Sequence, residues 1–572
     1  MASETFSRKP QLNKGKACFN CRHRKVKCDA ARPICGPCSR FVGGGLQDCE
    51  YTEVGLAQSQ ADYLTEQISI IESRIQELEQ PKELRTSVGL QNPYQPHHSA
   101  FISTSSHNTE FRSTSVCTDS IGRLSTRDLT CVFENSTTAS LHRGLSSSVS
   151  TCLVHFASVR LIFNNSIDSF LRYAPQIGFF LNTHLFDGLS SGVAPSQVAS
   201  PALLDSIYLW GSHLARSETL SKHESSFLAD ALRSTGTSLS RAHSATAILH
   251  TIQAEVLLAQ YFFRNARFLE GKYHASAAVS ISLSSGLHKI RSADARAFAV
   301  DELSPAATAL EEGERINAFW AVLTLNNCWF AADGSPADVS HAAHGIDTPW
   351  PLDIEVYSED AVLLPVSSSA TIDNFLANLP DRGTSLPALH AKAAILFEQA
   401  SQLATQQTET DAAPSHGNTF SAKFNTLDRV IAAFKHTLPP VNLNGTEPRL
   451  LVVHTLAHVA TIQLHNPFCF KSAGSRARAG AAAMAIVALL RQTDICELGY
   501  VDAIFGTLWT AACQVCITEL ALARGSSRSD SERLCAAIET LLAAMAVFAR
   551  DCRLIELQLA TAQQNYSSVR NR

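Results

Sequence analysis

Apolar side chains recur at helical spacing through the second part of the chain, from about residue 152 onward. The positions that form one apolar face of a predicted helix are Ile248, Ile252, Val256, Ala259 and Phe263. A second helix is predicted over residues 271–287, where it can pair with the first. Strand-like alternation is scarce, so residues 151–572 are predicted to form a large all-helical domain, an array of antiparallel helix pairs.

A third helical face in this region comes from Ile316, Phe319, Trp320 and Leu323. The run Asp333-Gly334-Ser335-Pro336 contains four residues typical of turns, and it predicts the end of that helix. With more than 400 residues the region is long enough to bury a large apolar core. The fold class expected for the whole chain is therefore mainly all-α.

A heptad pattern, with apolar residues at alternating steps of four and three, occupies residues 57–80. Such spacing places apolar side chains along one seam, so we predict a short coiled coil. Three heptads are marginal on their own, and the alternative is a single amphipathic helix that packs on its own chain. The seam begins with Ala57 and Ala61, and the residues expected to join two copies are Leu64, Ile68, Ile71, Ile75 and Leu78.

The apolar pattern fades between this seam and the helical region. Residues 101–150 contain 21 Ser and Thr and show little helical periodicity. A segment so poor in apolar side chains cannot bury enough surface to offset the entropy of ordering. We therefore predict a disordered linker over residues 86–150. No stretch is expected to reach the ~18–20 apolar residues of a membrane span, since the longest candidate, 479–490, is interrupted by Gly480.

The N-terminal segment contains a different pattern, which is formed by six cysteines. Two Cys-x-x-Cys pairs, each followed by a lone cysteine, suit soft metal ions. One tetrahedral zinc takes four sulfurs, so six serve two zincs if two thiolates are shared. A disulfide framework and a metal-storage protein are the alternatives. The first ten residues lack the apolar core of a signal peptide, and the other ten of the 16 cysteines are scattered. The six candidate ligands are Cys18, Cys21, Cys28, Cys35, Cys38 and Cys49.

The chain has a formal net charge of −5, but the charge is unevenly distributed. Residues 1–50 carry ten Lys and Arg against four Asp and Glu, a net charge of +6, whereas the remainder carries 37 against 48, or −11. A basic turn of helix is predicted between the second and third cysteines. Metal ligation beside a cationic helix is typical of DNA-reading modules. The candidate DNA-binding residues are Arg22, Arg24, Lys25 and Lys27.

Residues 17–51 closely resemble the fungal binuclear zinc cluster family, whose DNA-binding domain holds zinc with six cysteines. The resemblance implies a domain over residues 13–54 that binds two Zn²⁺ per chain. It implies that Cys18 and Cys35 bridge the two ions, that the second and third cysteines complete one site, and that the last two complete the other. The ten-residue gap before Cys49 is longer than is usual in the family.

The same resemblance assigns roles to the basic residues. Arg24 and Lys25 match the positions that read bases, which suits guanine acceptors in the major groove, and Arg22 and Lys27 are expected on phosphates. The half-site implied is a CGG triplet, bound by a homodimer in the nucleus. The basic run could also serve nuclear import.

The helical region resembles the fungal-specific transcription factor domain, an all-helical regulatory region often attached to such clusters. The motifs that carry this resemblance are Arg172-Tyr173-Ala174-Pro175, Glu270-Gly271-Lys272-Tyr273, Gly286-Leu287-His288, the run from Glu314 to Trp320, and the run from Ile346 to Pro351.

Catalytic patterns are weak in the helical region. His454 and His458 lie one helical turn apart, but Thr455 stands where a zinc protease has its glutamate base. Cys513 and Cys516 lie in an apolar helix, where buried cysteine behaves as a small hydrophobe. We therefore expect no enzyme, although an enzyme recruited to DNA by the cluster is one alternative.

The sequence predicts a DNA-binding transcription factor that regulates RNA polymerase II genes. Its expected partners are double-stranded DNA, a second copy of the chain, the transcription machinery or coregulators, and a small-molecule effector of unknown identity, with no membrane. The second alternative is a chromatin-recruited corepressor or interaction protein with little base specificity of its own.

Overall fold

The computed structural model divides the chain into two compact units, Met1–Ser103 and Thr104–Arg572. The predicted coiled coil and linker lie outside the described residues, so both stay predictions. The first unit is described at residues 17, 18, 21, 25–29, 31 and 35–39, and the second over residues 164–570, with gaps at 191–192, 194, 216, 242–243, 294–302, 340–344, 358–367, 411–416, 442–447 and 524–527.

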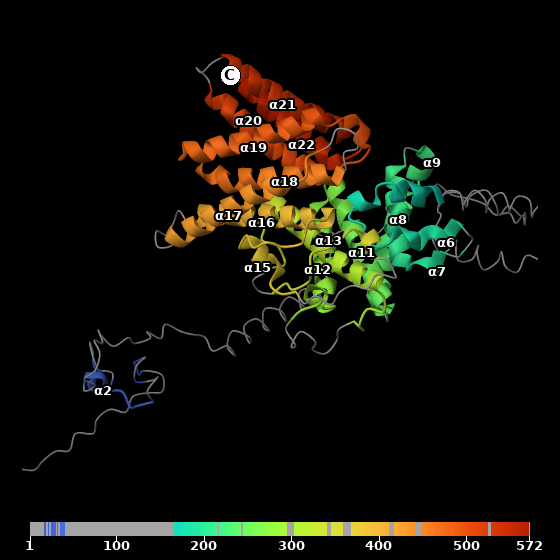
Figure 1. Ribbon diagram of the computed structural model, residues 1–572, viewed down its shortest axis with the longest axis horizontal. Coiled ribbons are helices and arrows are strands. Elements are labelled where there is room, and N and C mark those ends of the chain that lie inside the picture. Colours follow the sequence, from blue (N-terminus) through green and yellow to red (C-terminus); the bar gives the residue numbers. More distant parts are fainter. Residues whose placement is uncertain are drawn as a thin grey trace, which may run out of the picture. The chain divides into compact units, whose positions relative to one another are not determined.

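Helices supply almost all of the regular structure described in the second unit (Figure 1). The longer ones are α8 (Pro201–Leu214), α10 (Glu224–Ser238), α11 (Ala245–Arg264), α12 (Phe268–Ser284), α13 (Ala309–Asp333), α16 (Leu386–Thr410), α17 (Gly417–Thr437), α18 (Pro448–His465), α19 (Ala473–Gln492), α20 (Ile504–Leu522), α21 (Arg528–Ala549) and α22 (Arg553–Arg570).

Short elements connect these helices, and residues 164–171 are also helical. The described residues of this unit include no strand, and an isolated bridge joins Ser292 and Ser368. The all-helical expectation is confirmed. The short α-helices are α6 (Asp187–Ser190), α7 (Pro195–Val198), α9 (Glu218–Ser221) and α15 (Thr371–Leu376), and 3₁₀ helices span Ala174–Gln176, Thr183–Phe186, Leu239–Arg241, Leu287–Lys289, Ile354–Val356, Asn466–Phe468 and Ile495–Leu498.

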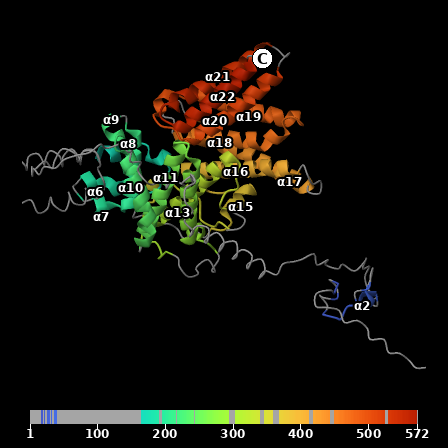
Figure 2. The same cartoon turned by 180° about the vertical axis from the view of Figure 1, so that it is seen from behind.

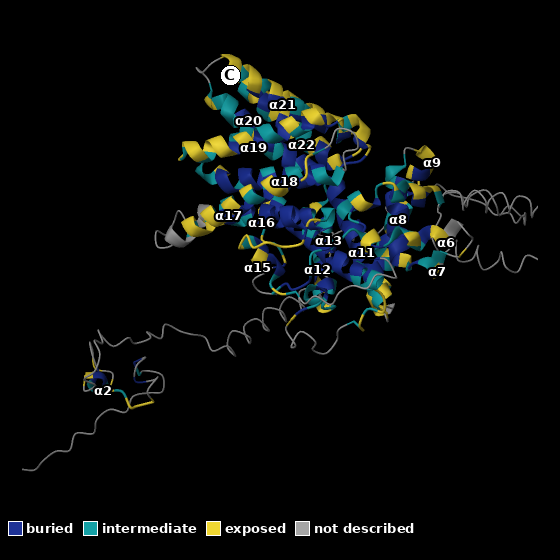
Figure 3. Cartoon of the chain, in the orientation of Figure 1, coloured by how far each residue is buried: buried dark blue, intermediate teal, exposed yellow. Residues whose placement is uncertain are grey.

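Helices that are close in sequence pack against one another. In the first half, α11 packs on α12 and α12 on α13, and α13 then packs on α16. In the second half, α18 packs between α16 and α19, and α20, α21 and α22 contact one another. Figures 1 and 2 show α8 to α13 on one side and α18 to α22 on the other. Buried residues occur throughout both halves, and exposed residues lie mainly on the outside (Figure 3).

The predicted pair at residues 248–287 forms as α11 and α12. The apolar face of α11 is buried, with Val256 and Phe263 at 1% exposure or less. Helix α12 is shifted by three residues toward the N-terminus relative to the predicted range. It ends before residue 287 because Gly286 has a φ of +71°, which stops the helical backbone. Gly271 allows the two helices to approach closely, since a Cβ there would lie 2.6 Å from the ring of Phe263.

Helix α13 ends where the turn residues predict. Gly334 follows it with a φ of +76°, a left-handed conformation that glycine adopts without a steric cost. At the other end the Thr308 hydroxyl accepts a hydrogen bond from the Glu311 N–H at 3.1 Å, which caps the helix. Between these ends Trp320 is buried, and the ring of Trp329 stacks on Phe263 of α11 at 4.1 Å.

Arg264, at the end of α11, joins the first half of the helical unit to its C-terminal helices. This buried guanidinium donates to the backbone carbonyls of Val501 at 3.1 Å and Asp551 at 2.9 Å. Its Nε donates to His213 of α8 at 3.2 Å, and its charge lies 4.8 Å from the centre of the Tyr500 ring. Because these partners are far apart in sequence, one side chain holds three parts of the fold together.

Helices α19 and α20 are long and apolar enough to cross a membrane by length and composition alone. The expectation that no stretch reaches that length is therefore wrong for these two helices. Alanines raise the mean hydropathy of α19, and larger apolar side chains and cysteines raise that of α20. Half of the apolar window of α20 is buried within the unit. Helix α20 packs on α21 and α22, and α19 packs on α18, as core helices do.

Candidate zinc centre and nucleic-acid interface

A cage of cysteine sulfurs forms the buried centre of the first unit. The Sγ atoms of Cys18 and Cys21 lie 3.5–3.8 Å from those of Cys35 and Cys38. Cys28 joins the group, because its sulfur and those of Cys18, Cys21 and Cys35 all lie within 4.8 Å of one another. Zinc binds sulfur at about 2.3 Å, so the edge of a tetrahedral site is about 3.8 Å. The sulfur spacing therefore fits zinc.

The cage includes the full set of sulfurs that the family resemblance gives to the first zinc. It also brings Cys38 to 3.8 Å from Cys18, as a second zinc sharing that sulfur requires. Cys21 and Cys38 approach to 3.7 Å as well, although the resemblance places them on different ions. The distances thus support a shared sulfur cage, while the choice of bridging cysteines stays a prediction. Cys49 lies outside the described residues.

Local hydrogen bonds set the orientation of each Cys-x-x-Cys pair. The backbone N–H of Cys21 donates to the sulfur of Cys18 at 3.4 Å. The second pair lies at the short helix α2 (Gly36–Ser39), where the N–H groups of Cys38 and Ser39 donate to the carbonyl of Cys35 at 2.9 and 2.8 Å. A tight turn after the first cysteine of each pair returns the second to the same face, so both sulfurs point inward.

Asp29 connects the two halves of the cage, and the sequence analysis missed it. Both of its carboxylate oxygens accept a hydrogen bond from the Gly36 N–H at 3.0 Å, which satisfies a donor at the start of α2. One oxygen also lies 3.4 Å from the N–H of Ala31. The available signal was an aspartate directly after the third cysteine, since such short carboxylates commonly bind nearby backbone N–H groups.

The basic run reverses direction within a few residues. Lys25 has a φ of +53°, and the Val26 N–H donates to the carbonyl of Cys21 at 3.0 Å. This combination is typical of a helix end with a left-handed residue. The predicted basic turn of helix therefore does not continue through Val26 and Lys27, and residues 22–24 lie outside the described residues. The physical reason is that Cys28 must return to the sulfur cage.

Lys25 and Lys27 are both exposed beside the buried sulfurs. Their ammonium groups can therefore contact a phosphate or a base edge without disturbing the packing of the sulfur cage. The other two candidate DNA contacts, Arg22 and Arg24, lie outside the described residues. The same holds for all five predicted dimer residues, which are Leu64, Ile68, Ile71, Ile75 and Leu78.

Burial disfavours free thiolates in this cage. Cys21 and Cys35 are fully buried, and burial raises the pKa of the Cys21 thiol to about 12 and raises the pKa of Cys35 as well. Buried negative charge needs a compensating cation. Zinc supplies that charge when it displaces the thiol protons, so metal binding and folding of so small a segment are linked.

In the two candidate catalytic patterns of the helical unit, the described side chains are hydrogen-bonded within the fold or buried. The Nε2–H of His454 donates to the Pro439 carbonyl at 2.8 Å, and burial lowers the pKa of His458 to about 4. The Thr455 hydroxyl donates to the Leu451 carbonyl at 2.7 Å, within the helix. Burial raises the pKa of Cys513 to about 12, which makes it a weak nucleophile.

Comparison with known families shows which proteins the two regions of the chain resemble. The model of the fungal Zn(2)-Cys(6) binuclear cluster domain matches residues 16–54, and that of the fungal specific transcription factor domain matches residues 162–379. Over these two regions the chain is therefore similar to fungal zinc cluster transcription factors. The zinc cluster domain binds two zinc ions. Neither matched family is an enzyme family.

The chain is also similar to a curated protein, the "Notoamide biosynthesis cluster transcriptional coactivator notQ'" of Aspergillus versicolor. The two are 40% identical over 75 residues, which is 13% of this chain and 13% of that protein. The similarity thus spans only a small part of each. No solved structure matches the chain.

Two motifs of the transcription factor domain meet in the structure. The indole N–H of Trp320 donates to the carbonyl of Pro349 at 2.6 Å, and its ring stacks on Trp350 at 4.4 Å. Asp347, in the same motif, accepts hydrogen bonds from Lys289 at 3.0 Å and Ser292 at 2.6 Å. These residues therefore position the connection after α13 against the α12 end, which is a structural role.

Proposed function

We propose that this chain is a nuclear transcription factor that binds double-stranded DNA sequence-specifically through its zinc cluster domain. The observation that carries the proposal is the buried sulfur cage with exposed lysines beside it. The zinc ions hold a cationic helix end rigidly, and the positive charge of residues 1–50 attracts phosphate. The net negative charge of the remaining chain favours contact with proteins over contact with DNA.

The proposed roles of the residues follow the family pattern. Cys18 and Cys35 bridge two zincs, and Cys49 completes the second site. Arg24 and Lys25 read the guanines of a CGG half-site, because cationic donors suit the O6 and N7 acceptors of guanine. Arg22 and Lys27 bind phosphates.

A second candidate follows from the relative, which is named a coactivator. A coactivator acts through another DNA-bound protein and needs little base specificity of its own. A sequence-specific factor binds its site when DNA is the only partner present, whereas a coactivator of this kind does not. The name of the relative also favours activation over repression as the output of this chain.

Selection from a random pool of duplex DNA tests the proposal. The zinc-loaded full-length chain should enrich sequences with a common CGG triplet, and the Cys35→Ser variant should enrich none. Cys496→Ser, which changes an exposed cysteine of the helical unit, is the matched control and should select the same sequences as the natural chain. Enrichment of no sequence by the zinc-loaded natural chain would favour the coactivator.

Dimerisation through residues 57–80 is the remaining part of the proposal. Replacing Ile68 and Ile75 together by lysine places two charges in the apolar seam and should give monomers in sedimentation experiments. Affinity for a paired site should fall sharply while affinity for a single half-site changes little, because linkage of two modules supplies the avidity. An unchanged mass would exclude this segment as the interface.

A further inference from the structure

The helical unit contains a cavity of about 310 Å³. It lies between the first half of the unit, which contributes α11 and α13, and the second half, which contributes α16, α18 and α20. This volume is at the lower end of the range of small-molecule sites, roughly 300–1,000 Å³. The zinc cluster does not contribute to it, so the cavity needs a separate explanation.

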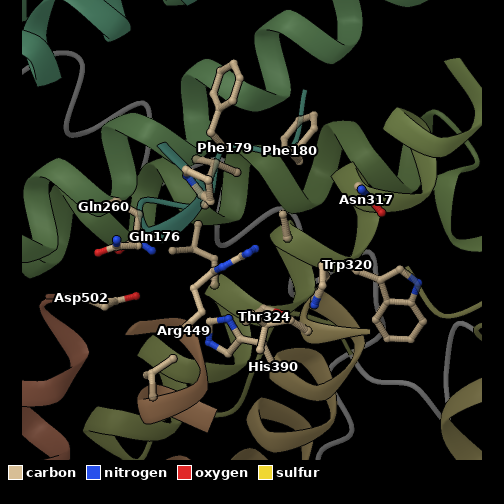
Figure 4. Close-up of a pocket in the computed structure, with 18 of the residues that line it drawn as sticks. Gln176, Phe179, Phe180, Gln260, Asn317, Trp320, Thr324, His390, Arg449 and Asp502 are labelled. Atoms are coloured by element: carbon tan, nitrogen blue, oxygen red, sulfur yellow. The ribbon is translucent and has the colours of Figure 1, made fainter. Parts of the chain in front are cut away.

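One wall of the cavity is aromatic. Phe179 and Phe180 contribute to one end (Figure 4). Trp320 and Trp329, both in α13, line the cavity as well. All four are largely buried, so their positions are fixed by the core around them. Rigid aromatic faces of this kind suit a flat ring, which gains both apolar burial and ring contacts.

The polar groups are divided between two sides. Arg449 of α18 and His390 of α16 lie next to each other and face the space below the two phenyl rings (Figure 4). Burial, and then the charge of Arg449, lower the pKa of His390 to about 4, so His390 is neutral at pH 7. The positive charge on this side therefore comes from Arg449, whose guanidinium suits a carboxylate.

The other side presents hydrogen-bond acceptors. Gln176, Gln260 and Asp502 lie together there (Figure 4). The Oε1 atom of Gln176 is buried and has no hydrogen-bond partner among the described residues. A buried acceptor without a hydrogen-bond partner is energetically unfavourable. A ligand hydroxyl or N–H group placed there removes that cost.

We propose that this cavity binds a small aromatic carboxylate that carries a hydroxyl or N–H donor at its opposite end. The carboxylate lies against Arg449, the ring against Phe179 and Phe180, and the donor against Gln176. Asp502 disfavours the reversed orientation, because it would place two carboxylates together. Asp353 and Glu355 also line the cavity. Glu355 is exposed, so its charge is screened by water, and Asp353 is half-buried and engaged in an interaction of its own.

The location of the cavity indicates how a bound ligand affects the contact between the two halves of the helical unit. Asp502 lines it and follows Val501, whose carbonyl accepts from Arg264, the residue that joins the two halves. A ligand between the halves therefore stabilises their contact and fixes the surface available to coregulators. This regulatory step rests on the proposed transcriptional function, whereas binding in the cavity does not.

Binding is measured on the zinc-loaded full-length chain with three related compounds. The reference is 4-hydroxyphenylacetate, 4-methylphenylacetate lacks the donor, and tyramine carries a cation in place of the carboxylate. Trp320 and Trp329 line the cavity, so tryptophan fluorescence reports occupancy, and calorimetry gives the stoichiometry. We expect one site per chain, with 4-methylphenylacetate at least fivefold weaker and tyramine at least tenfold weaker than the reference.

Two variants test the assigned contacts. Arg449→Gln should weaken 4-hydroxyphenylacetate at least tenfold, and Gln176→Leu should remove the preference for hydroxyl over methyl. Arg553→Gln is the control, since Arg553 is half exposed and pairs with Glu556 away from the cavity. Circular dichroism checks folding, and if Arg449→Gln does not fold, Gln176→Leu carries the test.

Three results would overturn the proposal: no saturable binding of any of the compounds, tighter binding of tyramine than of the reference, or equal effects of Arg449→Gln and Arg553→Gln. Binding to a CGG-containing duplex is measured on the same preparation. A chain that binds this DNA and none of the compounds contradicts the cavity proposal alone. A chain that binds the reference compound and no DNA contradicts the proposed function alone.

Discussion

The zinc cluster unit and the helical unit acquire their buried centres in different ways. The buried residues described in the first unit are four cysteines, whereas those of the second form one large cluster of apolar side chains. A segment of about 40 residues is too small to be stable on apolar burial alone and needs metals or disulfides. The helical unit has ample apolar surface to bury, so we expect its stability not to depend on a metal.

This difference predicts that each unit can be damaged without the other. In the small unit the free energy of metal binding stabilises the folded state, so apolar groups cannot replace the sulfur ligands there. In the helical unit the energy is distributed over many side chains, so single changes cost part of the stability. Three experiments test this separation, in order of the expected effect.

Loss of zinc should have the largest effect. Chelation, or Cys35→Ser, should release both ions and abolish specific DNA binding, because the shared thiolate belongs to both sites. The helical signal in circular dichroism and its melting temperature should stay unchanged. Cys496→Ser is the control and should keep two zincs per chain. Retention of one zinc by Cys35→Ser would show that this sulfur does not bridge.

Truncation of a core tryptophan should have the next largest effect. Trp210 of α8 is fully buried, and its indole N–H donates to the Leu257 carbonyl of α11 at 2.8 Å. Trp210→Ala should lower the free energy of unfolding of the helical unit by about 3–5 kcal/mol in urea titrations. Zinc content should remain at two. Leu269→Ala, at a residue that is 83% exposed, should change stability by less than about 0.5 kcal/mol. A fall in zinc content with Trp210→Ala would show that the units are coupled.

Substitution of the exposed lysines should have the smallest effect, and it sharpens the comparison within the first unit. Lys25→Ala should cost about 1–3 kcal/mol of binding and relax the preference within the triplet, as expected for a base contact. Lys27→Ala should weaken all sequences equally and reduce the salt slope by about 1, as expected for a phosphate contact. Neither should change helical stability. Titrations of matched and altered duplexes across a salt series measure both, and identical behaviour would contradict the assigned roles.

Local pattern determined much of this protein. The spacing of the cysteines predicted a sulfur cage that holds zinc, because ligands two and six residues apart can meet without help from the rest of the fold. Helical periodicity predicted α11, and Gly334 with its neighbours predicted the end of α13. These features depend on backbone geometry within a few residues.

Tertiary structure decided the features that depend on distant contacts. Arg264 binds carbonyls 237 and 287 residues away in sequence, and no local pattern indicates such partners. The cavity likewise combines Gln176, Phe180 and Arg449, which come together only when both halves pack. Even in the small unit, the left-handed Lys25 follows from the return of Cys28 to the cage. Periodicity determines which face of a helix is buried, whereas the neighbour that covers this face is chosen by the packing of the whole chain.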